Sequence, residues 1–332
     1  MIISKTPYRI SLFGGGSDFP GWYKSNKGIT ISSTIDYYLY ITIRNLPGFF
    51  SNFKYRLSYS KIEKTKSINE IQHPAVKKYL KYIKFSHPLE IHVDSDLPAR
   101  SGIGSSAVFI VGLINAFNNF IGKKKNINQI AREAIHFEQN VMNSACGSQD
   151  QIIASYGGFK KIFYENNKFK VNEVAIGKKN KKKLENNLLL FFTGFSRRSY
   201  LIENLKIKNL DLNHNKIRQL VSYTYEALKI LESNLDLNQL SYLMDELWNM
   251  KKQFSKNVSN SKIDDIYDFA KRNGAKSGKL IGAGGGGFFL FLVNNYKDKI
   301  KLIKSLEKKC IYVPVKFTDL GTEIIYRKEE YI

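Results

Sequence analysis

The sequence predicts an α+β protein of two domains that meet near residue 185. Its 332 residues suit two domains of ordinary size, and 43% of them are hydrophobic, enough to form real cores. Residues 28–44 are rich in Ile, Tyr and Thr with partial alternation, which indicates a strand. Long helical patterns follow the Lys-rich run 177–183. We therefore assign residues 1–185 to one domain and residues 186–332 to a second.

The first domain is predicted to mix strands and helices. Alternating β-branched and aromatic residues predict strands at 7–13, 28–44, 88–94, 159–166 and 168–176. Apolar residues at helical spacing predict helices at 105–120, from near residue 126, and at 148–155. The Lys-rich run 177–183 is expected to be a solvated loop.

The second domain is predicted to combine long helices with short, buried strands. Helical patterns cover residues 211–233 and 237–273, and a further Lys-rich helix precedes the last strand. Continuous apolar runs predict strands at 188–194, on both sides of the glycines 284–287, and at 310–317.

The net charge of +23 allows two interpretations. A basic surface can bind nucleic acid, because Lys and Arg release counterions from phosphates. The alternative is compositional drift, since Lys, Asn, Ile, Tyr and Phe are abundant together. We favour drift and disfavour nucleic acid as a partner, because no helix-turn-helix, zinc-finger or RRM pattern is present. The same field would attract a phosphorylated small molecule.

The sequence favours a cytoplasmic protein. No apolar run is long enough to cross a bilayer, so no membrane partner is expected, and the N-terminus lacks the apolar segment of a signal peptide. Cys146 and Cys310 are far apart in sequence, which does not indicate a disulfide framework. A monomer or a homodimer is expected.

The stretch "PARSGIGSSA" (98–107) is the strongest local signal. It satisfies the pattern G-x-G-x-x-A of dinucleotide-binding folds, but the preceding strand ends too early, and no acidic residue stands about 20 positions later. A Walker A motif is absent as well. Glycines here let backbone N–H groups point into one concavity, and Ser105 and Ser106 open a helix whose amides favour an anion. The stretch therefore predicts an anion-binding loop.

Three segments resemble, in the expected order, motifs of the GHMP kinase family. The stretch 98–107 resembles the ATP-phosphate loop, "YRISLFGGGSDFP" (8–20) the N-terminal sugar-kinase motif, and "IGAGGGGFF" (281–289) the glycine-rich C-terminal motif. The resemblance spans nearly the whole chain. It implies a two-domain GHMP kinase fold, in which the N-terminal domain is like the second domain of ribosomal protein S5 and the C-terminal domain is ferredoxin-like.

The resemblance also implies the residues that bind ATP. The phosphates would lie on the loop residues Pro98, Arg100, Ser101, Gly102, Ile103, Gly104, Ser105 and Ser106. Tyr59 and Ser60 would line the adenine pocket.

Asp150 stands where the family has its catalytic Asp, after a Cys-Gly pair. Its role would be to accept the proton of the attacking hydroxyl; the alternative is an Asp that caps free amides of a helix. Arg9 matches a basic residue that faces this Asp in related sugar kinases, and would keep it ionised and stabilise charge at the transfer point. The alternative is a strand Arg that faces solvent.

Glu138 lies on the preceding helix at the spacing of the family's magnesium-binding Glu. A buried carboxylate requires a cation, so the resemblance implies Mg²⁺ held by Glu138, Ser106 and the nucleotide phosphates. The alternative is a solvated helical Glu.

Several further residues would bind the substrate. Asp18, with Gly15, Gly16 and Ser17, matches the segment that binds sugar hydroxyls, although a Ser-Asp turn is an alternative. Arg197 and Arg198 could fork onto a substrate phosphate. Gly284, Gly285 and Gly286 would close on the nucleotide and substrate phosphates; a hairpin with unusual torsions is the alternative.

Within the family, "GGGSD", "PARSG" and "TGFSR" are most similar to the members that act on a heptose 7-phosphate. The resemblance implies ATP-dependent phosphorylation of the anomeric hydroxyl of that sugar phosphate. Two alternatives stay open: another anomeric sugar kinase, for L-fucose or an unphosphorylated hexose, and a basic nucleic-acid-binding protein on the same scaffold without catalysis.

Overall fold

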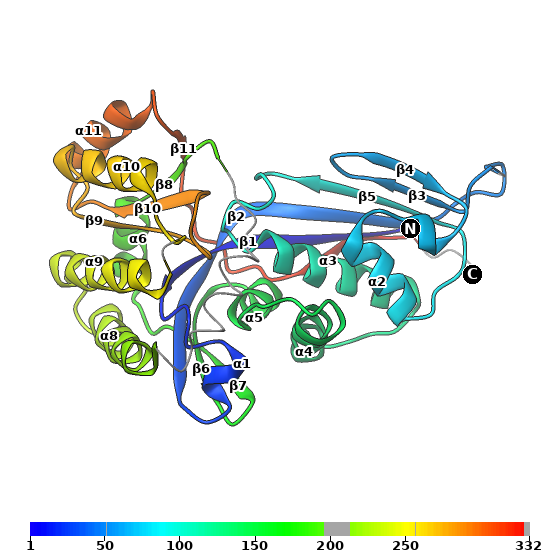
Figure 1. Ribbon diagram of the computed structural model, residues 1–332, viewed down its shortest axis with the longest axis horizontal. Helices are drawn as coiled ribbons and strands as arrows, with labels where there is room; N and C mark the ends of the chain where they lie inside the picture. Colours follow the sequence, from blue (N-terminus) through cyan, green and yellow to red (C-terminus); the bar gives the residue numbers. More distant parts are fainter. Residues whose placement is uncertain (51, 196–212, 256, 329–332) are drawn as a thin grey trace.

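The computed structural model describes residues 1–50, 52–195, 213–255 and 257–328. Within these residues the strands form an 8-stranded sheet and a 4-stranded sheet (Figure 1). The larger sheet carries the N-terminal part of the chain, and the smaller one the C-terminal part. Helices of the C-terminal part lie beside the end of the larger sheet at which its first strand, β1 (Ile2–Phe13), ends, and the two parts of the chain face each other there.

The larger sheet is built around its two longest strands. β2 pairs with β1 along most of its length, with β5 at its C-terminal end and with β6 at its N-terminal end. The strands follow the order β12-β1-β2-β5-β3-β4, and β6 and β7 extend the other end of β2. Their bounds are β1 (Ile2–Phe13), β2 (Gly28–Asn45), β3 (Tyr55–Ser58), β4 (Ile62–Thr65), β5 (Leu89–Ser95), β6 (Phe159–Glu165), β7 (Lys168–Glu173) and β12 (Glu323–Arg327).

Helices cover one face of this sheet (Figure 1). The central helix, α3 (Ser105–Phe120), packs against β1 and β2, and it is buried on almost all sides because its side chains are mainly apolar. The helices of this part are α1 (Pro20–Tyr23), α2 (Pro74–Tyr82), α3 (Ser105–Phe120), α4 (Ile127–His136) and α5 (Gln149–Tyr156). α4 begins at a capping box formed by Asn126 and Gln129.

The smaller sheet has the order β11-β8-β10-β9 with antiparallel pairs throughout. Helices connect β8 to β9 and β10 to β11, which is the βαββαβ arrangement of ferredoxin-like domains. The elements are β8 (Leu188–Phe192), α8 (His214–Glu232), α9 (Leu237–Phe254), α10 (Ser261–Arg272), β9 (Ser277–Leu280), β10 (Phe288–Leu292), α11 (Tyr296–Leu306) and β11 (Ile311–Val313).

Two details of the predicted elements are wrong. The Lys-rich run is part of helix α6 (Lys178–Asn187) and not a loop, because Lys is a good helix former and the buried Leu184 anchors the helix. The helical pattern at 237–273 is two helices, since Asn260 caps a new helix with its side chain. The strands β3, β4 and β12 and the helix α2 were not predicted.

The last strand returns to the first sheet. β12 pairs with β1, so residues near the C-terminus of the described chain complete the sheet that begins at residue 2. The division into residues 1–185 and 186–332 stays a prediction, and β12 is a C-terminal strand that joins the N-terminal sheet.

Candidate active site

The loop between β5 and α3 is closed by its own side chains. The Ser101 hydroxyl donates to the Pro98 carbonyl at 2.6 Å, and the backbone N–H of Arg100 donates to the Ser105 hydroxyl at 2.9 Å. Ile103 is fully buried and anchors the loop in the core. The loop therefore presents its backbone and the N-terminus of α3, and this end of a helix favours an anion.

The C-terminal glycine loop packs directly on this first loop. Gly102 has φ +86° and Gly282 has φ +75°, and a Cβ on Gly102 would lie 2.5 Å from the Ile281 carbonyl oxygen. The backbone N–H of Phe288 donates to the Ser101 carbonyl at 3.0 Å. The two glycine-rich motifs, about 180 residues apart in sequence, thus form one structure, in which backbone contacts backbone.

Replacing Gly102 with Ala should therefore destabilise this structure. The matched control is Gly122→Ala, because Gly122 has a similar φ of +73° but no atom within 4 Å of the added Cβ. Backbone strain alone costs about 1–3 kcal/mol, so Gly122→Ala should lower the unfolding free energy by that amount and Gly102→Ala by more. Denaturant unfolding measures both. Equal losses in the two variants would contradict close packing at Gly102.

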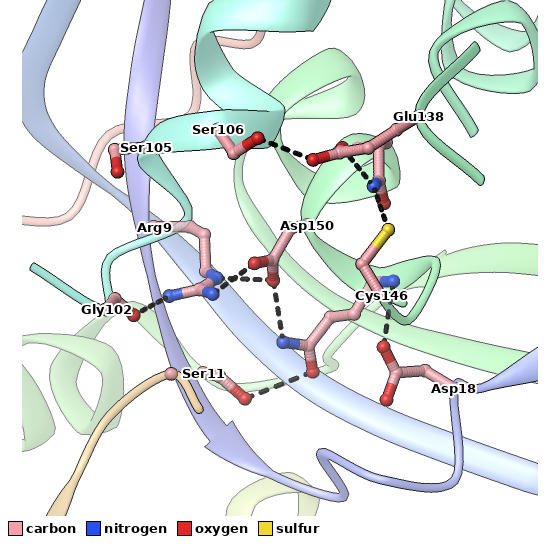
Figure 2. Close-up of polar contacts among 12 residues, drawn as sticks. Arg9, Ser11, Asp18, Gly102, Ser105, Ser106, Glu138, Cys146 and Asp150 are labelled. Carbon is pink, nitrogen blue, oxygen red and sulfur yellow. Dashed lines mark hydrogen bonds and ion pairs between the residues drawn. The ribbon is translucent and has the colours of Figure 1, made fainter. Parts of the chain in front are cut away.

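Arg9 and Asp150 form a bidentate ion pair at the foot of the loop (Figure 2). Arg9 Nε donates to Asp150 Oδ1 at 2.7 Å, Nη2 donates to Oδ2, and Nη1 donates to the Gly102 carbonyl at 2.9 Å. Arg9 lies on β1 and is buried, whereas the Asp150 side chain, in the first turn of α5, is 28% exposed. The pair therefore holds one carboxylate at the cavity surface, next to the backbone of the anion-binding loop.

Gln149 links Asp150 to a second carboxylate. Its side-chain Nε2 donates to Asp150 Oδ1 at 3.3 Å, its Oε1 accepts from the Ser11 hydroxyl at 3.1 Å, and its backbone N–H donates to Asp18 Oδ2 at 3.1 Å. Gly147 lets Asp18 approach, because a Cβ there would lie 1.9 Å from Asp18 Oδ2. Gln149 thus contacts both carboxylates and holds Asp18 and Asp150 side by side.

The environment of Asp18 disfavours its charged form. The side chain is buried, and the Asp18 Oδ1 atom accepts from the backbone N–H of Gly16 at 2.9 Å. Burial raises the pKa of Asp18 despite this bond, and the negative charge of Asp150 raises it further. A sugar hydroxyl is a neutral donor that suits such a carboxylate.

Ser106 and Glu138 face each other beside the ion pair (Figure 2). The Ser106 hydroxyl donates to Glu138 Oε1 at 2.6 Å, and Gln151 Nε2 donates to Glu138 Oε2 at 2.6 Å. Glu138 is buried in a π-helical turn (Phe137–Val141) that follows α4, and burial raises the pKa of its carboxyl.

These oxygens fit a magnesium ion that also binds nucleotide phosphates. Mg²⁺ is usually bound by one or two carboxylates together with substrate phosphates. Glu138 and Ser106 both line the cavity at the start of α3, and the described residues hold no group of three or more His, Cys, Asp or Glu able to bind a metal by themselves. The residues present therefore suit an ion that arrives with the nucleotide.

Arg9, Asp18, Ser106, Glu138 and Asp150 line a cavity of about 250 Å³ between the two parts of the chain. Gly15 and Gly16 also line it, whereas the Ser17 hydroxyl donates to the backbone carbonyls of Gly14 and Ile29 and is not part of the lining. The C-terminal part contributes the wall residues Leu220, Leu247, Trp248, Lys251, Lys279, Gly282 and Ala283.

Some predicted residues lie elsewhere. Gly284 packs against Val258, Gly286 against Phe195, and the Gly285 N–H donates to the Val258 carbonyl at 2.9 Å, so none of the three lines the cavity. Arg197 and Arg198 lie outside the described residues.

Tyr59 and Ser60 form the turn between β3 and β4, away from the cavity lining. The Tyr59 ring meets His73 edge-on at 4.9 Å, and His73 lies 4.8 Å from the Phe109 ring in α3. This row of rings leads to the helix that carries the anion-binding loop, and the adenine pocket stays a prediction.

Sequence reasoning missed several cavity residues. Gln149 and Gln151 flank Asp150 in the stretch "SQDQ", so their position beside the predicted catalytic Asp was a usable signal. Ser11 lies within the motif 8–20 but had been given no role. Trp248, Lys251 and Lys279 had no such signal, because only the packing of α9 and β9 against the first part places them there.

Comparison with known proteins agrees with this geometry. The description "GHMP kinases N terminal domain" matches residues 69–158, and "GHMP kinases C terminal" matches residues 211–311. The chain is 32% identical over 330 residues to D-glycero-alpha-D-manno-heptose 7-phosphate kinase from Campylobacter jejuni, with 94% of this chain and 95% of that protein covered. The chain belongs to the GHMP kinase family.

Solved structures of this family share the fold of this kinase. A D-glycero-D-manno-heptose 1-phosphate kinase from Bacteroides thetaiotaomicron superposes with a TM-score of 0.80 at 21% identity, covering 99% of this chain and 100% of that one. Mevalonate kinase from Methanococcus jannaschii gives a TM-score of 0.70 at 25% identity, covering 95% of this chain and 98% of that one. The predicted two-domain GHMP kinase fold is confirmed.

Family membership makes the protein a phosphotransferase with an alcohol group as acceptor, and GHMP kinases use ATP as the phosphoryl donor. None of the helices within the described residues is long and apolar enough to span a membrane.

Proposed function

We propose that this kinase transfers the γ-phosphoryl group of ATP to the anomeric hydroxyl of D-glycero-D-manno-heptose 7-phosphate. The 1,7-bisphosphate formed would supply nucleotide-activated heptose for a surface polysaccharide. The substrate is suggested by the 32% identical relative. The observation that carries the reaction is the carboxylate of Asp150, held at the cavity surface by the fork of Arg9, directly beside the anion-binding loop.

Each protein group has a task in this reaction. Asp150 accepts the proton of the sugar hydroxyl while the hydroxyl oxygen bonds to the γ-phosphorus and the bond to the β-phosphate oxygen breaks, which releases ADP. Arg9 orients Asp150 and stabilises the charge that develops nearby. The loop and the first amides of α3 hold the phosphates.

Glu138 and Ser106 would hold the magnesium ion, which neutralises phosphate charge when bound. Gln151 orients the Glu138 carboxylate for this purpose through its bond at 2.6 Å.

Asp18 would accept hydrogen bonds from the sugar hydroxyls. It lies on the same side of the cavity as Asp150, and the backbone N–H groups of Gly16 and Gln149 fix both of its oxygens. The sugar would therefore lie against both carboxylates, with its reacting hydroxyl toward Asp150.

A substrate panel tests this function. The panel contains heptose 7-phosphate, heptose 1-phosphate, the unphosphorylated heptose, L-fucose and galactose, with ADP release as the measurement and ³¹P NMR to locate the new phosphate. We expect preferred turnover of heptose 7-phosphate with the new phosphate at the anomeric carbon. Preferred turnover of fucose, or salt-dependent binding of nucleic acid without ADP release, would contradict the proposal.

The raised pKa of Asp18 predicts a pH dependence. Sugar binding requires the ionised carboxylate, so kcat/KM should fall on acidification at a higher pH than an ordinary Asp would give. In Asp18→Asn this group no longer titrates, so kcat/KM should be lower at neutral pH and the acid limb that Asp18 contributes should disappear. Measurement of kcat/KM from pH 4.5 to 8 checks this. An unchanged acid limb in the variant would assign the titration to another group.

A further inference from the structure

The two oxygens of the Asp150 carboxylate have different surroundings. Oδ1 accepts from Arg9 Nε at 2.7 Å and from Gln149 Nε2 at 3.3 Å, whereas Oδ2 accepts, among the described residues, from Arg9 Nη2 alone (Figure 2). An ionised carboxylate can accept about four hydrogen bonds, two on each oxygen. The position that stays free for a further donor is therefore on Oδ2.

Oδ2 also lies beside the start of α3. A Cβ added at Gly104, the N-cap of this helix, would lie 3.3 Å from Asp150 Oδ2. Gly104 belongs to the anion-binding loop, and both residues line the main cavity. Because Gly104 has no side chain, a hydroxyl that donates to Oδ2 can lie next to the helix end that favours an anion.

Ser11 fixes the orientation of the Gln149 side-chain amide. The Ser11 hydroxyl donates to Gln149 Oε1 at 3.1 Å, so Nε2 is the end of the amide that faces Asp150. The reverse orientation would place the amide oxygen against a carboxylate, and neither group could donate a hydrogen bond to the other. Gln149 is buried, so its amide keeps a donor on Oδ1.

We infer that Gln149 is a positioning residue that, together with Arg9 Nε, occupies Oδ1 and leaves Oδ2 to accept the proton of the substrate hydroxyl. The inference rests on the proposed function. In the transfer step the proton moves to the free lone pair of Oδ2, and the hydroxyl oxygen bonds to the γ-phosphorus. The bond from that phosphorus to the bridging oxygen breaks, and its electron pair leaves with ADP.

Gln149→Met tests this role, because Met has a similar length but cannot donate to Asp150. The backbone N–H that Gln149 donates to Asp18 at 3.1 Å is retained, so the proposed sugar-binding carboxylate keeps this bond. We expect kcat to fall about 10-fold, the lower end of what one hydrogen bond to a charged group contributes, with KM for sugar and ATP nearly unchanged. Steady-state ADP release is measured with the sugar of the substrate panel that the wild type turns over fastest.

A double-variant cycle shows whether Gln149 acts through Asp150. In the Asp150→Asn background the carboxylate is already lost, so Gln149→Met should lower kcat much less than it does in the wild type. Ser11→Ala should lower kcat by a smaller factor than Gln149→Met, because the amide then loses only its anchor.

Gln139→Met is the matched control. Gln139 Nε2 donates to the Cys146 carbonyl and to the Ser148 hydroxyl, both at 3.1 Å, so this side chain supports the segment that leads into α5. Gln139 does not line the main cavity. The control should therefore lower the thermal unfolding temperature with little change in kcat.

Other outcomes overturn the inference in distinguishable ways. An unchanged kcat in Gln149→Met, or equal losses in both backgrounds, would show that Gln149 only packs beside Asp150. A higher KM for the sugar without a loss of kcat would assign Gln149 to sugar binding through Asp18. A wild type that turns over no sugar of the panel would overturn the proposed function, and this inference with it.

Discussion

Replacing Asp150 with Asn should lower kcat by about 10²–10⁴-fold, the usual contribution of a positioned general base. Asn has nearly the same shape, so the helix α5 has little reason to move, but its single acceptor oxygen can keep only one arm of the Arg9 fork. The amide cannot accept the hydroxyl proton, which then has no acceptor beside the anion-binding loop. Steady-state ADP release at saturating sugar and ATP measures the effect.

The matched control is Asp245→Asn. Asp245 is likewise bonded to a cation, Lys271, and to a backbone N–H, that of Gly278, but it does not line the cavity. This control should lower thermal stability with little change in kcat. Titration with a fluorescent ATP analogue should show that Asp150→Asn still binds nucleotide. A turnover near that of the wild type would refute the assignment of Asp150 as the base.

Arg9→Met should lower kcat by about 10²–10³-fold, the scale seen when one preorganised charged or polar donor is removed from a reaction centre. The substitution removes the fork that holds Asp150 and the bond to the Gly102 carbonyl. Arg9→Lys keeps the charge but not the bidentate geometry, so it should recover only part of the rate. Single-turnover kinetics with saturating substrates separate this loss from slow product release.

The double variant Arg9→Met with Asp150→Asn tests whether the pair acts as a unit. Residues that act together give strongly non-additive effects, so the double variant should be little slower than the slower single variant. Arg44→Met is the control, because Arg44 makes a comparable ion pair with the buried Glu90 on another part of the sheet. Multiplication of the two single effects would indicate that Arg9 and Asp150 contribute separately.

Much of the fold could be predicted because its signals are local. The strands 28–44 and 188–194 and the helix from Ser105 were found from periodicity, and they agree closely with β2, β8 and α3. The short strands β3 and β4 were missed, since four residues with mixed exposure carry little periodicity. Strand β12 was missed because its pairing with β1 depends on a partner more than 300 residues away.

The sequence by itself determined the family and the chemical groups of the site. Glycines at positive φ, a serine pair at a helix start and an Asp in the first turn of a helix are local requirements, so their spacing appears in the sequence. The resemblance to GHMP kinases, and with it the prediction that Arg9, Asp150, Ser106 and Glu138 act in the site, follows from these local patterns alone.

Only the tertiary structure decided how these groups are paired and what else surrounds them. The fork of Arg9 on Asp150, the contacts of the backbone and side-chain amides of Gln149, and the place of Lys251 in the cavity wall depend on contacts between elements distant in sequence. Whether two groups form a hydrogen bond depends on differences in distance of a few tenths of an ångström, and no residue pattern encodes such differences. The second glycine loop shows this limit. The resemblance predicted phosphate binding at Gly284, Gly285 and Gly286, whereas in the structure their neighbours Gly282 and Ala283 line the cavity.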